Sequence, residues 1–68
     1  MDFGNALNAL RAGHKVTRCG WPTEFWVKIE QVGEEKHEVI VRNTRFGVED
    51  WIDIDPDNLL ATDWEIVD

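Results

Sequence analysis

The stretch FWVKIEQVGEEKHEVIVR, residues 25–42, decides the fold of this 68-residue chain. Its first half alternates apolar side chains with polar or bulky ones, which is the period of a half-buried strand. The second half repeats the alternation after the polar turn GEEK, so the two runs predict an antiparallel hairpin. The alternation puts Phe25, Val27 and Ile29 on one side of the sheet and Trp26 on the other, where a second subunit would cover it. We therefore expect strands over residues 25–32 and 37–42.

The segment before this hairpin predicts a helix over residues 1–12. Asp2 suits the N-cap, and Gly13 after Arg11 is the usual sign of a helix end. One apolar face follows the i, i+3, i+4, i+7 spacing and consists of Phe3, Ala6, Leu7 and Leu10.

The rest of the chain reads as short strands and turns. Asp55 and Pro56 open a short helical turn that continues through residues 59–62, because proline and acids suit a first helical turn. Further strands are expected at 15–19, 48–54 and 64–67. The predicted fold class is α+β: a single domain over residues 1–68, with one N-terminal helix packed on a small, twisted, mainly antiparallel sheet.

A chain of this size has a marginal core. It buries only ~60% of the surface that its unfolded form exposes, and one such core rarely supplies more than ~3 to 5 kcal/mol. Cys19 is the only cysteine, so no disulfide forms within the chain, and one thiol with His14 and His37 makes no zinc site. Self-association is the remaining way to stabilise so small a core, so we expect a homodimer or homotetramer. No apolar run reaches membrane-spanning length and no signal-like segment precedes the domain, so we expect a cytosolic protein with no membrane partner.

Charge is unevenly distributed along the chain. The formal net charge is -7, yet all seven Lys and Arg residues lie in residues 1–46, while residues 47–68 hold eight acids and neither Lys nor Arg. This balance argues against direct nucleic-acid binding, which depends on basic side chains that neutralise phosphates. It is compatible with one small anionic ligand held by a few local arginines.

The candidate catalytic groups have no spacing that ties a nucleophile to a base and an orienting group. We interpret Cys19 as a small, partly buried hydrophobe on a strand, His14 as a helix-end residue and His37 as a surface residue. No glycine-rich phosphate cradle is present either. The prediction is a non-enzyme without cofactor or metal.

The aromatic residues are a stronger lead. Four tryptophans and three phenylalanines share a core that one helix and a few short strands cover only partly, and exposed aromatic area usually marks an interface or a stacking platform. Phe3, Phe25 and Trp64 lie on the apolar sides of their elements and read as core. For Trp21, in a Gly-Trp-Pro turn, and Trp51, plain packing and ligand contact both stay open.

Polar residues near these two tryptophans complete the candidate ligand site. An arginine beside a tryptophan holds a nucleotide, with the base on the ring and the phosphate on the guanidinium. The arginines in question are Arg18, Arg42 and Arg45, of which we select Arg18 and Arg45. Asn43 and Asp53 join the predicted ligand-binding set, since an acid accepts hydrogen bonds from ribose hydroxyls.

Both ends of the chain resemble a known family. The opening DFGNALNALRAGHKVTRCGW, residues 2–21, resembles the MDFGxALxxLKxGxKVxRxGW opening of the small phage proteins called Thoeris anti-defence, second type. The ending LLATDWEIVD, residues 59–68, resembles that family's DLLAxDWxxV ending. The family's Pro-Ser loop and Gly-Lys-Gly segment are replaced here by IDIDPDN and PTEF, so the identity of the ligand stays open.

This resemblance implies a helix on an antiparallel sheet that assembles as a homo-oligomer. It also implies a sponge that acts in the cytoplasm of the infected bacterial host. Such a sponge binds a cyclic ADP-ribose isomer made by an immune enzyme, or a cyclic oligonucleotide, without cleaving it. Gly20 and Trp21 match the family's Gly-Trp turn and Trp51 matches its second tryptophan, so both tryptophans would line a pocket between subunits.

Two other functions fit parts of the sequence. The acidic residues 47–68 suit a protein-binding inhibitor or DNA mimic, because a dense anionic face imitates a phosphate array. A carbohydrate binder has only the tryptophans in its favour.

Overall fold

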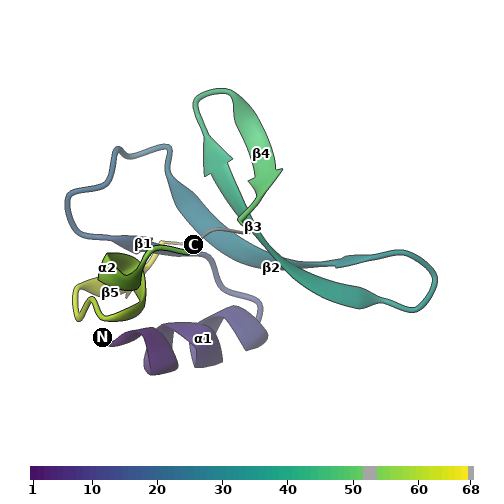
Figure 1. Ribbon diagram of the computed structural model, residues 1–68, viewed down its shortest axis with the longest axis horizontal. Coiled ribbons are helices and arrows are strands. Elements are labelled where there is room, and N and C mark those ends of the chain that lie inside the picture. The colour runs from purple at the N-terminus through teal and green to yellow at the C-terminus, as the bar shows by residue number, and fades with distance from the viewer. Residues whose placement is uncertain (52–53, 68) are drawn as a thin grey trace.

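The computed structural model describes residues 1–51 and 54–67, and over these residues the chain forms one antiparallel sheet covered on one face by a helix (Figure 1). The strand order is β4-β3-β2-β1-β5, and each described pair of neighbours is antiparallel. This confirms the α+β prediction. The elements in chain order are α1 (Phe3–Arg11), β1 (Val16–Arg18), β2 (Trp26–Val32), β3 (His37–Thr44), β4 (Gly47–Asp50), α2 (Pro56–Leu59) and β5 (Trp64–Ile66).

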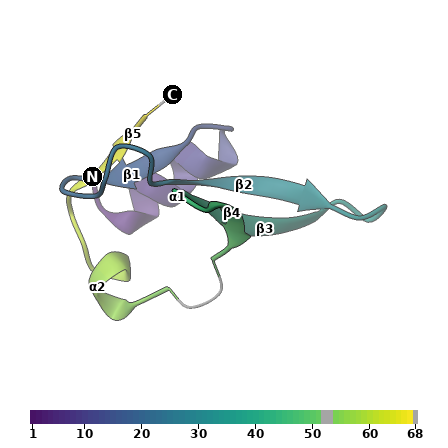
Figure 2. The same ribbon diagram turned by 90° about the horizontal axis from the view of Figure 1, so that it is seen from above.

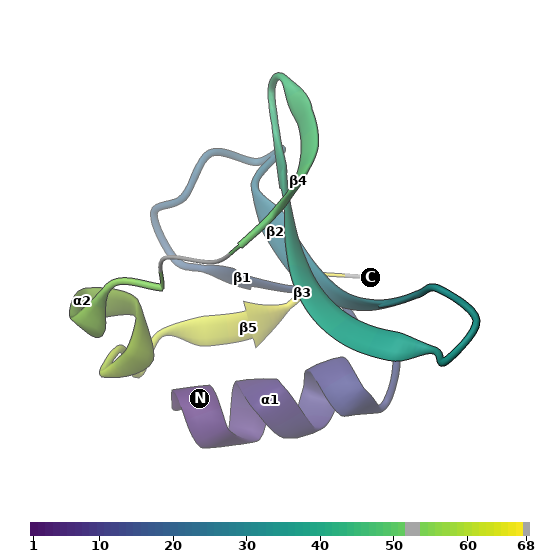
Figure 3. The same cartoon turned by 45° about the vertical axis from the view of Figure 1, so that its right-hand side comes forward.

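Helix α1 begins and ends where its capping residues predict. The Asp2 carboxylate accepts a hydrogen bond of 2.8 Å from the backbone N–H of Asn5, which satisfies one of the free donors of the first turn. Gly13 follows the C-cap with φ of +97°, a backbone conformation that suits glycine. The helix lies against β1, β2 and β5, on one side of the sheet (Figure 3).

The β2–β3 hairpin has the register that its alternation predicts. Val27 pairs with Arg42 and Trp26 pairs with Asn43, so the members of each pair point to the same face. Val27 belongs to the core with Ala6 and Leu10 of α1, and we call its side of the sheet the helix face. Trp26 and Asn43 lie on the other side, the outer face. The turn end of this hairpin projects beyond α1 (Figure 2).

The core on the helix face consists of two parts, one under α1 and one made of aromatic side chains. Ala6 and Leu10 of α1 cover Val16 and Val27 near the centre of the sheet. Aromatic side chains continue the core beyond the start of the helix, as described below. Since only one face of a half-covered antiparallel sheet carries such a core, the outer face keeps mixed polar and apolar residues.

Two expectations near β1 were wrong. Cys19 is exposed, because β1 ends at Arg18 and Cys19 enters a turn instead of continuing the strand. Phe25 lies before β2, where its N–H donates to the Pro22 carbonyl, and it is half-buried, not a full core residue. The helix α2 also ends at Leu59, earlier than the expected turn through residues 59–62.

Leu10 tests how strongly stability depends on the contact between α1 and the sheet. It is 1% exposed, so Leu10→Ala removes buried methyl groups and leaves a cavity, which should cost ~2 to 5 kcal/mol. Leu60→Ala is the matched control, because Leu60 is 81% exposed and its truncation should change stability by less than ~0.5 kcal/mol. Thermal and urea unfolding measure both. Equal effects from the two variants would contradict the described packing of α1.

Candidate functional site

Three of the four tryptophans meet beyond the N-terminal end of α1. Trp21, Trp51 and Trp64 contact one another pairwise in edge-to-face geometry, with ring centroids 5.9 Å apart for Trp21 and Trp51, 5.4 Å for Trp21 and Trp64, and 6.1 Å for Trp51 and Trp64. Phe3 of α1 packs on Trp64 at 5.6 Å. These separations are in the range that aromatic pairs prefer. We call Trp21, Trp51 and Trp64 the tryptophan cluster.

Each member of the cluster is placed by a different piece of backbone. Trp21 follows a turn in which its N–H donates to the Arg18 carbonyl at 3.1 Å, and Gly20 provides the positive φ of +94° in that turn. Trp51 follows β4, and its N–H donates to the Ile40 carbonyl at 2.8 Å, so it lies on the helix face. Trp64 opens β5 and pairs with Arg18. The cluster therefore joins segments far apart in the sequence.

The members of the cluster differ in exposure. Trp64 is fully buried and donates its indole N–H to the Asn58 carbonyl at 3.0 Å. Trp51 is 7% exposed, so within one chain it packs in the core. Trp21 is only partly buried, at the edge of the cluster. Of the three rings, Trp21 is thus the one that a ligand could reach without a change of conformation.

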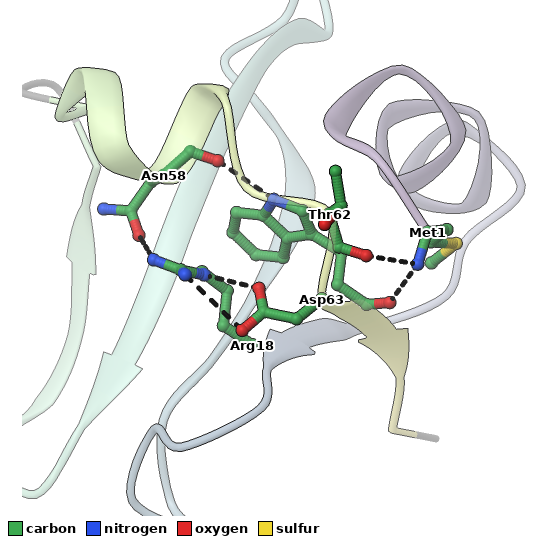
Figure 4. A network of polar contacts seen from close by, with 6 residues as sticks. Met1, Arg18, Asn58, Thr62 and Asp63 are labelled. Atoms are coloured by element: carbon green, nitrogen blue, oxygen red, sulfur yellow. Dashed lines mark hydrogen bonds and ion pairs between the residues drawn. The ribbon is translucent and has the colours of Figure 1, made fainter.

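Arg18 lies beside the cluster at the centre of a polar network (Figure 4). Its Nε donates to Asp63 Oδ1 at 2.9 Å, its Nη2 to Asp63 Oδ2 at 3.4 Å, and its Nη1 to Asn58 Oδ1 at 2.9 Å. The Met1 amino group donates to the carbonyls of Thr62 and Trp64 on the same loop. Arg18 therefore ties β1 to the segment between α2 and β5, and three of its N–H groups are engaged.

The hydrogen bond from Arg18 holds the pKa of the Asp63 carboxyl below its ordinary value of 3.8. Partial desolvation opposes this effect and the charge of Arg18 adds to it. The same hydrogen bond raises the pKa of Arg18. Both groups are thus held in their charged forms.

Arg42 is a second cation next to the cluster. Its guanidinium carbon lies 5.9 Å from the centroid of the Trp51 ring, within the range of a cation–π contact. Its Nη2 donates to Glu49 on the neighbouring strand at 2.9 Å. The sequence places Arg42 near the aromatics, but it offers no reason to prefer it over Arg18 or Arg45.

The remaining predicted site residues lie elsewhere. Asn43 is on the outer face, and its side-chain amide donates to the Glu24 carbonyl at 2.7 Å. Arg45 is exposed in the turn between β3 and β4. Asp53 lies outside the described residues. Asn58 was missed, because its part depends on a contact with Arg18 across 40 positions of the chain, which no local pattern signals.

Trp26 is half-buried on the outer face, opposite the cluster. The Lys15 ammonium lies 4.7 Å from the centroid of its ring. Trp26 therefore points where the alternation predicts, and its contact with a second subunit stays a prediction.

The acids of residues 47–68 are not all available to a basic partner. Glu49 is paired with Arg42 and Asp63 with Arg18, so two of these carboxylates already serve the fold. Among the described residues, no group of three or more His, Cys, Asp and Glu side chains is arranged to hold a metal ion. Within the same residues, no helix has the length and apolar character needed to span a bilayer.

Asp63 tests whether the network contributes to stability in the way its pKa indicates. A carboxyl whose pKa is lower in the folded than in the unfolded chain stabilises the fold at higher pH, and this contribution disappears as pH falls through the lowered value. Asp63→Asn should therefore lower the melting temperature at neutral pH, and the difference from wild type should shrink at pH values below 3.8. Glu65→Gln is the control with the same change in charge. A difference for Asp63→Asn that does not depend on pH would contradict this role of the ion pair.

Comparison with known proteins gives one family. A search of curated proteins returned no match. The family model described as Thoeris anti-defense 2-like domain matches residues 1–67, which include α1, all described strands and the tryptophan cluster. No enzyme family is indicated, and the family acts against a bacterial defence during phage infection. The chain therefore belongs to the Thoeris anti-defense 2-like family and is assigned a phage anti-defence role.

Proposed function

We propose that this protein binds and sequesters a small nucleotide messenger of bacterial immunity without cleaving it. The messenger is a cyclic ADP-ribose isomer or a cyclic oligonucleotide, and binding takes place in the cytoplasm of the infected cell. Membership of the anti-defence family supports this function, since removal of a messenger silences the effector that it would activate. A sponge of this kind needs a rigid binding surface but no catalytic group.

The observation that carries the proposal is the partly exposed Trp21 ring backed by two buried tryptophans. Trp51 and Trp64 pack against the Trp21 ring, so little side-chain freedom remains to be lost on binding. A base stacked on an aromatic ring gains ~1 to 3 kcal/mol. Arg42 beside the Trp51 ring is the nearby cation for the phosphates, while Arg18 is engaged with Asp63 and Asn58, and a guanidinium matches the chemistry of a nucleotide with a pyrophosphate.

We further propose that the protein acts as a homodimer or homotetramer with its pocket between subunits. A 68-residue chain has a marginal core, and a second copy would bury additional apolar surface. Trp26 on the outer face supports this proposal, because its ring is only half-covered and lies away from α1. A symmetric assembly would also repeat each pocket.

Trp21→Ala tests the stacking role. Loss of one stacked ring should weaken binding of the messenger about tenfold or more, which corresponds to at least ~1.4 kcal/mol. Isothermal titration calorimetry with a panel of cyclic ADP-ribose isomers, cyclic dinucleotides and cyclic trinucleotides measures this. Release of chemically intact ligand after heat denaturation distinguishes sequestration from cleavage.

Phe46→Ala is the matched aromatic control for this titration. Phe46 is 93% exposed in the β3–β4 turn, away from the cluster, and its removal should leave binding of the messenger within about twofold. No binding by the wild type across the whole panel would refute the sponge. Equal losses from Trp21→Ala and Phe46→Ala would refute the placement of the stacking site.

Trp26→Glu tests the assembly. The variant puts a carboxylate where the half-covered ring would meet a second subunit. The protein should shift from an oligomer to a monomer, because the carboxylate would lose its hydration in an apolar interface. Size-exclusion chromatography with light scattering measures the mass of wild type and variant. Leu60→Glu is the control, because Leu60 is exposed at the C-cap of α2. This variant should have the same oligomeric mass as wild type. A wild type that is already monomeric at high concentration would contradict the proposal.

A further inference from the structure

Arg42 occupies an unusual position for a charged side chain. It lies on the helix face of the sheet, in the same row as the fully buried Val27, and beside the ring of the buried Trp51. Along that row Arg42 stands between the buried Val27, which is followed by the buried Val16, and Glu49 on the edge strand β4. Placing a charged side chain among apolar residues is unfavourable unless a structural partner or a ligand compensates the charge.

The hydrogen bonds of Arg42 are incomplete. Its Nη2 donates to Glu49 Oε1, but its Nε is buried and has no acceptor within hydrogen-bond distance among residues 1–51 and 54–67. A buried donor without an acceptor is unfavourable, so a conformation that supplies one is favoured. Of the carboxylates that the structure describes, Glu49 is the one that holds this guanidinium.

Arg18 differs from Arg42 in the number of hydrogen bonds that its guanidinium makes. Arg18 donates from Nε and Nη2 to both oxygens of Asp63 and from Nη1 to Asn58. Three of the five N–H donors of this guanidinium, Nε–H among them, are therefore engaged within the fold. By contrast, the Glu49 side chain on Arg42 is 55% exposed, and an exposed ion pair of this kind is weak.

We infer that Arg42 and Trp51 form a subsite for the phosphate or pyrophosphate of a nucleotide, and that Glu49 occupies this subsite as a competing carboxylate until the anion displaces it. The guanidinium fork matches the oxygens of a phosphate and binds them in a bidentate manner. A small rotation of the side chain would bring the buried Nε to a phosphate oxygen. Glu49 then moves into solvent, where its exposed position already lets it be hydrated.

The geometry of the cluster agrees with such a ligand. The centroid of the Trp51 ring lies 5.9 Å from that of Trp21 and 5.9 Å from the Arg42 guanidinium carbon, so Trp21 and Arg42 are at most about 12 Å apart. A nucleotide with its base on Trp21 reaches that far with its diphosphate. This inference rests on the proposed function for the identity of the nucleotide, but the anion subsite is testable by itself.

Three variants separate the roles of the pair. Glu49→Gln removes the competing charge and should tighten binding of ADP about two- to fivefold, which is the range of an exposed ion pair. Arg42→Gln removes the phosphate donor and should weaken binding of ADP about tenfold or more. Arg42→Lys keeps the positive charge but lacks the planar guanidinium. Its affinity for ADP should therefore lie between those of Arg42→Gln and wild type. Calorimetry with ADP measures the three variants.

The controls come from the Lys28–Glu30 pair on the outer face, whose charged atoms are 3.5 Å apart. Glu30→Gln and Lys28→Gln change the net charge by the same amounts as Glu49→Gln and Arg42→Gln. Both should leave ADP binding within about twofold, because only screened, long-range charge effects remain. Equal effects from the two pairs would overturn the inference, since net charge would then explain them.

Nuclear magnetic resonance tests the contact directly. Titration of the ¹⁵N-labelled protein with inorganic pyrophosphate should shift the Arg42 Nε–H signal, while the Arg18 Nε–H signal stays in place. An unmoved Arg42 signal at saturating pyrophosphate would overturn the subsite. If pyrophosphate moves the Arg42 signal but no cyclic nucleotide binds, the subsite stands and the sponge fails. If a cyclic nucleotide binds wild type and Arg42→Gln equally, the sponge stands and the subsite fails.

Discussion

The packing of Trp64 is the contact on which the rest of the structure depends. Its ring touches Phe3 of α1, Trp21 after β1 and Trp51 after β4, and its indole N–H bonds to Asn58 in α2. Its backbone pairs with Arg18 and with Met1. Five segments of the chain therefore meet at one side chain. In a domain with so little core, a large aromatic residue at such a junction replaces many smaller contacts.

The same junction prepares the candidate binding surface. Trp64 and Trp51 are buried, and they support Trp21, which alone of the three is partly exposed. The Arg18 network closes the loop that carries Trp64 and keeps that loop beside β1. Stability and binding thus share their residues here. This sharing suits a protein that must hold a ligand tightly in a small chain, because the binding surface is rigid before the ligand arrives.

Local patterns were sufficient for α1 and the β2–β3 hairpin, but not for the bounds of the short strands, since the strand expected over residues 48–54 ends at Asp50, and not for the site. The capping residue Asp2 and the apolar face of residues 3–10 predict α1, and strict alternation predicts β2 and β3 with the correct face for Trp26. Cys19 was assigned to a strand because nothing in the sequence shows that β1 ends after three residues. Asn43 and Arg45 belong to the predicted ligand-binding set, yet Asn43 lies on the outer face and Arg45 in a turn. Distance along the chain is a poor guide to distance in space when strands pair across turns.

By itself, the sequence determined the fold class, the helix, the hairpin register and, through its two terminal blocks, the family, because each of these is written in short-range periodicity or in contiguous motifs. Only the tertiary structure decided that Trp51 is buried while Trp21 stays partly exposed, and how the two arginines beside the cluster are hydrogen-bonded. Trp21, Trp51 and Trp64 come from three separate segments, and the difference between Arg18 and Arg42 is a difference in hydrogen-bond partners across strands. Such partners are set by long-range pairing, which leaves no local signal in a single sequence.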